Sequence, residues 1–181
     1  MLRPPLSITD RARGALLGHA AGNALGVPTE FLGGPEAIQA AFPGGLRDIL
    51  RQDTPASPFD DDVAMALLLA EELLTGDVDL ERLAHRWIHW LDADGRGAGV
   101  WTRTALNHLR THGSPPSSTG GRAPNGAVMR ALPVALATRG SPGNLVAGTW
   151  HTAALTHPDD RCTWSAVAVN VAAAELLAGR R

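Results

Sequence analysis

Helix start and stop signals recur along the whole sequence, whereas the apolar–polar alternation of β-strands is almost absent. Ser7 with Asp10 three residues later is typical of a helix start, and the glycine and proline within residues 26–28 are typical of a helix end. Only residues 27–31 allow a short strand. The sequence therefore predicts an all-α fold.

The remaining sequence predicts further helices separated by loops. These helices are expected over residues 60–76, 80–93, 100–112, 126–139, from 141 onward, and 159–178. Leu83, Trp87 and Leu91 share one face of the second of them, which is therefore expected to enter the core. A bend is expected before Pro133. Residues 114–124 are rich in Pro, Ser and Gly and predict a loop.

Glycines recur every four residues in the first predicted helix, at positions 14, 18, 22 and 26. Inside a helix, each costs about 1 kcal/mol relative to alanine. Such a stripe allows another helix or a ligand to approach the backbone closely, and helix packing is the interpretation that needs no function. We therefore expect the stripe to pack against another helix.

Length and composition indicate a single globular domain over residues 1–181. A net charge of −2 and a hydrophobic content of 44% are typical of a folded protein and exclude a disordered chain. The single cysteine, Cys162, excludes an internal disulfide and favours a reducing compartment, where it is expected to be a buried thiol.

Several classes of partner are disfavoured by the same sequence. No apolar stretch reaches the roughly 18 residues that a membrane span needs. Polar residues interrupt the first apolar stretch, so we expect no signal peptide and a cytoplasmic location. Because the net charge is not basic and no recognition motif appears, we also expect no nucleic-acid partner.

Three consecutive carboxylates, Asp60, Asp61 and Asp62, stand directly before the apolar residues 63–70. Because adjacent anions repel one another, a folded chain needs positive charge beside them. A helix N-terminus supplies some, at roughly 0.3–1 kcal/mol for each acid. A hard divalent cation such as Mg²⁺, Mn²⁺ or Ca²⁺ binds the same oxygen ligands. The run alone therefore leaves two interpretations open, a helix cap and a metal site.

Residues 95–158 contain no acid although they carry several arginines. Such a segment favours an anionic ligand such as a phosphate ester, but segregated solvent-facing helix surfaces produce the same pattern. Within it, Asn125 follows Gly120 and Gly121 and begins a predicted helix, whose first backbone N–H groups are suited to phosphate. Asn is also an ordinary N-cap. The segment is thus a candidate phosphate-binding region.

Glu30 and His157 are further candidates. Glu30 follows the first predicted helix among apolar residues, a setting that raises a carboxyl pKa and suits proton transfer. The residue by itself favours the other interpretation, a solvated loop position. His157 lies where a loop meets a helix. The histidine pairs at 85 and 89 and at 108 and 112 offer two ligands each, and we interpret them as structural.

Read in order, four segments resemble one family. GALLGHAAGNALGVPTE (14–30) is similar to the opening motif of the ADP-ribosylglycohydrolase family. DDDVAM (60–65) resembles its metal motif, Thr/Ser-Asp-Asp-Thr-x-Met. NGAVMR (125–130) resembles its Asn-Gly-x-x-Met-Arg segment, and LTHP (155–158) resembles its Leu-Thr-His motif.

The resemblance implies an all-α, multi-helix orthogonal bundle that binds two Mg²⁺ or Mn²⁺ ions and hydrolyses ADP-ribose from a modified protein or a small molecule. Carried over by position, Asp60, Asp61 and Asp62 are the expected metal ligands, with Asp60 in the place of a hydroxyl ligand. Glu30 matches the acidic residue near the scissile bond and is expected to be catalytic. The residues expected to bind the substrate are Gly120, Gly121, Arg122, Asn125 and His157.

The sequence also departs from the family. Asn23 and Val63 stand where the family usually has an aspartate and a hydroxyl residue. The family's second metal motif, Gly-x-Asp-x-Asp/Thr-Thr, has no counterpart after His157, so we expect a C-terminally shortened fold with half of a two-metal site. The sequence is either a piece of a longer protein or a diverged form. An inactive ADP-ribose- or nucleotide-binding module and a purely structural helical module are therefore alternatives to the hydrolase.

Overall fold

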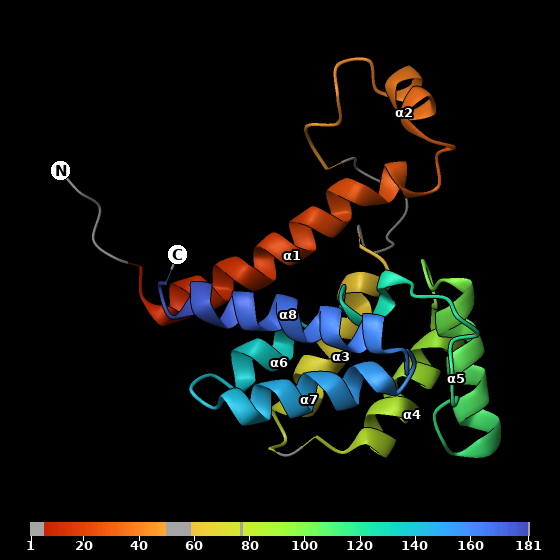
Figure 1. Cartoon of the computed structure of the whole chain (residues 1–181). Coiled ribbons are helices and arrows are strands. Elements are labelled where there is room, and N and C mark those ends of the chain that lie inside the picture. The colour runs from red at the N-terminus through yellow and green to blue at the C-terminus, as the bar shows by residue number, and fades with distance from the viewer. Residues whose placement is uncertain (1–5, 50–58, 77, 181) are drawn as a thin grey trace.

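The computed structural model describes residues 6–49, 59–76 and 78–180, and every regular element within these ranges is a helix (Figure 1). The all-α expectation is therefore confirmed for the described part of the chain. In chain order the elements are α1 (Ile8–Glu30), α2 (Pro35–Ala41), α3 (Asp61–Leu73), α4 (Leu80–Ala93), α5 (Val100–His112), the short 3₁₀ helix η1 (Asn125–Ala127), α6 (Leu132–Ala137), α7 (Pro142–Ala154) and α8 (Asp160–Leu177).

The end of α1 differs from the prediction. The helix does not end between Gly26 and Pro28 but continues to Glu30, and residues 27–31 form no strand. Pro28 lies close to the end of the helix, where its missing N–H removes a single helical hydrogen bond. The Thr29 hydroxyl donates to the Gly26 carbonyl at 2.8 Å and satisfies another polar group of this last turn. Glu30 is consequently the last residue of a helix rather than part of a loop.

The predicted helix over residues 126–139 is divided into η1 and α6. Pro133 lies in the first turn of α6, a position that proline favours because its N–H would be unpaired there and its φ angle is already helical. The bend expected before this proline is confirmed. Helix α2, which begins at Pro35 directly after Gly34, was not among the expected helices.

The main core lies between α3, α4, α5 and α6. Met65, Leu83, Trp87, Leu106 and Val134 are fully buried there. The Trp87 indole N–H donates to the backbone carbonyl of Met65 at 3.2 Å, so the largest side chain of the core also satisfies its polar atom. The predicted apolar face of α4 is confirmed, and it packs against α3.

A second cluster of small side chains joins α7 and α8, which lie side by side in Figure 1, to η1. Ala127, Ala153, Cys162 and Ala166 are buried in it, and the expected buried thiol is confirmed. From α8, the Asn170 amide donates to the Ala131 carbonyl at 2.8 Å and to the Thr149 hydroxyl at 2.9 Å. These contacts hold the loop before α6 against α8.

The glycine stripe of α1 is exposed, and the prediction that it packs against a helix is wrong for the described residues. A Cβ atom built at Gly14, Gly18, Gly22 or Gly26 would meet nothing within 4 Å. The helix instead buries Ala24, on another face. The four glycines do lie along one face of α1, as their spacing predicts. The sequence does not show, however, whether another helix packs on that face.

None of the described helices is both long enough and apolar enough to cross a membrane.

Candidate functional site

The three consecutive carboxylates meet at the N-terminus of α3. Asp60 and Asp61 are buried and Asp62 is half-buried, and one oxygen of each lies within 4.8 Å of the others. Among the described residues, no other group of three or more His, Cys, Asp or Glu side chains comes together in this way. Of the two histidine pairs, His108 and His112 stack on each other, with their ring centroids 4.2 Å apart.

The carboxylate of Asp60 does not cap α3. Asp60 occupies the N-cap position, but its side chain accepts no hydrogen bond from the first turn of the helix. Asp79 and Asp159, at the N-caps of α4 and α8, both accept such a bond from a backbone N–H, at 3.0 and 2.9 Å. The helix-cap interpretation therefore does not account for the Asp60 side chain.

Asn23 of α1 ties the cluster together. Its amide nitrogen donates to Asp60 Oδ1 at 2.7 Å and to Asp62 Oδ2 at 2.9 Å. Its amide oxygen accepts from the backbone N–H of Asp60 at 3.0 Å. These three bonds fix α1 against the start of α3. The amide carries no charge, however, so it leaves the negative charge of the cluster uncompensated.

The pKa values of the acids reflect this uncompensated charge. Burial, followed by the charges of Asp60, Asp62 and Glu30, raises the pKa of Asp61 to about 7. Burial and the charge of Asp60 raise the pKa of Asp62 to about 6, and burial followed by the same cluster raises that of Glu30. No ion pair between described residues brings a cation to the three aspartates. The cluster thus favours bound protons or a bound cation.

Gly97, in the loop between α4 and α5, closes the cluster from the other side. Its φ angle is +79°, and a Cβ atom there would lie 2.7 Å from Asp60 Cγ and from Asp61 Oδ1. Only glycine fits both the backbone conformation and the space. Gly97 was not among the residues expected at the site, although the alternating glycines at 95, 97 and 99 indicate unusual backbone geometry.

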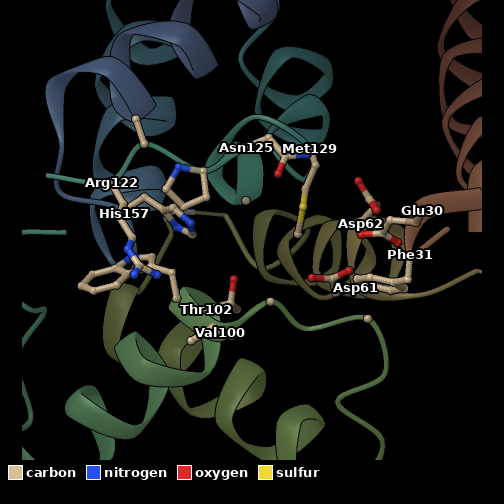
Figure 2. Close-up of a pocket in the computed structure, with 16 residues that line it drawn as sticks. Glu30, Phe31, Asp61, Asp62, Val100, Thr102, Arg122, Asn125, Met129 and His157 are labelled. Carbon is tan, nitrogen blue, oxygen red and sulfur yellow. The ribbon is translucent and has the colours of Figure 1, made fainter. Parts of the chain in front are cut away.

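A cavity of about 520 Å³ extends from the acids. Figure 2 shows Glu30, Asp61 and Asp62 on one side of it and Arg122 and His157 on the other. Its remaining lining residues come from the end of α1, the loop between α4 and α5, the start of α5, and η1 with its flanking residues: Phe31, Gly97, Gly99, Val100, Trp101, Thr102, Ala123, Pro124, Asn125, Gly126 and Met129. Residues that are far apart in the sequence therefore line one cavity with an acidic and a basic side.

Only some of the predicted substrate-binding residues line the cavity. Arg122, Asn125 and His157 line the cavity, whereas Gly120 and Gly121 do not. The two glycines have φ angles of +62° and +80° and form the turn that precedes Arg122. Their conformation explains why glycine is used there without any contact with a ligand.

His157 is buried and its ring lies against η1. A Cβ atom at Gly126 would be 2.7 Å from Cε1 and Nε2 of this ring, so the glycine permits the contact. Burial, together with the charge of Arg130, lowers the pKa of His157 to about 3, and the imidazole is therefore neutral. The basic side of the cavity consists of one charged guanidinium, from Arg122, and one neutral ring.

A second cavity, of about 550 Å³, adjoins the first along the exposed face of α1. Gly18, Gly22 and Asn23 line it, and Glu30 and Asp62 line both cavities. The glycine stripe thus lines a cavity that reaches the acid cluster. This position is compatible with the other interpretation of the stripe, in which a ligand approaches the backbone of α1.

Comparisons with known proteins agree with one another. The family model described as ADP-ribosylglycohydrolase matches residues 4–181. ADP-ribosyl-[dinitrogen reductase] glycohydrolase of Rhodospirillum rubrum is 34% identical over 160 residues, which are 83% of this chain and 52% of that protein. ADP-ribosylarginine hydrolase Tri1 of Serratia proteamaculans is 30% identical over 154 residues, 77% of this chain and 40% of that protein.

A solved structure titled ADP-ribosylglycohydrolase-related protein complex superposes with a TM-score of 0.73 at 30% identity. The match covers 95% of this chain and 58% of that one. The chain therefore spans about half the length of the curated relatives that it matches.

Proposed function

The chain belongs to the ADP-ribosylglycohydrolase family, and from this premise we propose that it contributes a metal-dependent site for removing ADP-ribose from a modified protein or a related conjugate. The observation that carries the proposal is the uncompensated acid cluster at one side of a cavity whose other side holds Arg122 and His157. In an ADP-ribose conjugate, the ribose and its glycosidic bond would lie at the acidic side, and the diphosphate would lie at the side that carries Arg122.

The residues present fit a divalent cation. Three carboxylates converge, two have raised pKa values, and Gly97 leaves the space that a side chain would fill. Asp60, Asp61 and Asp62 would hold Mg²⁺ or Mn²⁺ through oxygen ligands, which both ions prefer. A bound ion would orient ribose hydroxyls and lower the pKa of a water molecule.

Glu30 is the proposed proton-transfer residue. Cleavage at an anomeric carbon needs an acid for the leaving group or a base for water. Glu30 lines the cavity beside Asp61 and Asp62, and burial together with the charges of Asp60 and Asp62 raises its pKa above the ordinary value of a glutamate. The end of α1 therefore supplies a carboxyl group that can hold a proton where the bond would break.

The opposite side would bind the remainder of the substrate. Arg122 supplies a positive charge for a diphosphate, and Asn125 supplies an amide that can bond phosphate or ribose oxygens. The neutral ring of His157 offers one further polar group without adding charge. The absence of acids from residues 95–158 keeps this side attractive to an anion.

Release of ADP-ribose from an ADP-ribosylated peptide in the presence of Mg²⁺ or Mn²⁺ tests the proposal. We expect release by the wild type and a loss of at least about 100-fold for Asp61→Asn, since a metal ligand is removed. Asp160→Asn, at the exposed start of α8, is the matched control and should keep wild-type activity. No release by a folded wild-type protein with either ion would contradict hydrolysis by this chain.

A binding module without turnover is the second candidate. The family resemblance implies two metal ions, whereas the described residues contain one group of three carboxylates. This difference favours a module that binds without catalysing. Calorimetric titration with ADP-ribose separates the two functions. Binding without turnover supports the module, and absence of binding excludes it.

A further inference from the structure

Arg130 is a buried cation that makes no direct ion pair, although the charge of Asp61 acts on it from a greater distance. Its side chain is 1% exposed, and no ion pair between described residues includes it. The guanidinium carbon lies 4.3 Å from the centroid of the Trp87 ring. Its nitrogens donate to the Gly126 carbonyl at 2.5 Å and to the Thr156 hydroxyl at 2.5 Å. Burying a charged side chain is costly, and these hydrogen bonds offset part of that cost. The same bonds fix the position of the groups that accept them.

The Thr156 hydroxyl connects Arg130 to His157. Its oxygen accepts from Nη2 of Arg130 and lies 2.7 Å from Nδ1 of His157. A hydroxyl has a single proton, and no other described group accepts it. The proton of Thr156 therefore points at Nδ1, which accepts it.

The state of the ring follows from this bond. Because Nδ1 accepts, the neutral imidazole carries its proton on Nε2. Burial, and then the positive charge of Arg130, oppose a second proton on the ring. No described residue accepts a hydrogen bond from Nε2, and His157 lines the cavity. The Nε2–H group is thus left for a ligand.

We infer that Thr156, held by Arg130, is a positioning residue that fixes His157 as an Nε2–H donor toward acceptor oxygens of a ligand. An acceptor-only group such as a phosphate or diphosphate is the class that this donor recognises. The ligand part of the inference rests on the proposed function, whereas the state of the ring does not. Arg130 acts through Thr156 and touches no ligand.

The test compares wild type with Thr156→Val, which keeps the shape but removes the hydroxyl, and with Thr156→Ser, which restores it. Ring ¹⁵N chemical shifts of His157 at neutral pH report which nitrogen carries the proton. We expect an Nε2–H ring in wild type and in Thr156→Ser, and a changed tautomer in Thr156→Val. Thr163→Val, which removes an equally buried hydroxyl on α8, should leave the ring signals unchanged.

Titration with ADP-ribose gives the second readout. Losing one oriented donor should weaken binding by Thr156→Val about fivefold to tenfold, with rescue in Thr156→Ser. A protonated Nδ1 in wild type, or an unchanged ring and affinity in Thr156→Val, would overturn the inference. If wild type binds no ADP-ribose but the ring changes as expected, the proposed function fails while the role of Thr156 stands.

Discussion

Uncompensated charge at Asp61 determines how the acid cluster responds to pH. Its pKa of about 7 lies well above the ordinary value of 3.8, so the folded chain keeps a proton that the unfolded chain releases. Without metal, this group therefore destabilises the fold increasingly as the pH rises from about 4 to above 7. Asn at the same position stays neutral throughout.

Asp61→Asn should consequently stabilise the metal-free protein at pH 8 by about 1–2 kcal/mol and much less at pH 5. The lowered pKa of His157 acts in the opposite direction, but it is common to both proteins and cancels in their difference. Urea unfolding in the presence of a chelator at the two pH values measures this difference. A stability difference that does not grow with pH would show that Asp61 is not desolvated beside other anions.

Gly97 gives a second residue-level test. Gly97→Ala forces a positive φ on alanine and places its Cβ against Asp60 and Asp61, so we expect a loss of about 1–3 kcal/mol in unfolding free energy. Gly99→Ala is the control from the same loop, because a Cβ there meets nothing within 4 Å. Equal effects of the two substitutions would mean that the loop does not close against the acids.

At the level of elements, local signals located α3, α4, α5 and α8 well, because caps and apolar faces are encoded within each helix. They misplaced the end of α1, which continues past Pro28 to Glu30. They also gave a wrong partner for the glycine stripe. The spacing of residues predicts which of them share a helix face, but what packs on that face depends on segments elsewhere in the chain.

Gly14→Ala tests the exposed face of α1. Alanine restricts the unfolded chain and favours the helix, so stabilisation by about 0.5–1 kcal/mol is expected where the new Cβ meets nothing. Gly126→Ala is the contrasting variant, since its Cβ would lie 2.7 Å from the His157 ring, and it should destabilise. Chemical unfolding measures both, and destabilisation by Gly14→Ala would mean that this face is covered in solution.

For the whole molecule, the site could be predicted only in part. Residue chemistry alone made the three aspartates, Glu30 and His157 candidates, but it favoured a helix cap over a metal site for the aspartates and a solvated position for Glu30. The order of four motifs favoured the metal site, and the fold then brought Glu30, Asp61, Arg122 and His157 around one cavity. The alternating glycines at 95, 97 and 99 indicate unusual backbone geometry, but the contact of Gly97 with the acids and that of Arg130 with Thr156 depend on how helices pack, so the sequence did not predict them.

The central claim is that Asp60, Asp61 and Asp62 bind a divalent cation. Anomalous diffraction from a crystal soaked in Mn²⁺ tests it most directly, because the signal locates the ion without any assumption about activity. The account predicts a peak within about 2–2.5 Å of carboxylate oxygens of the cluster, absent in crystals of Asp61→Asn and retained in Asp160→Asn. A well-ordered wild-type crystal with no peak at these carboxylates would contradict it.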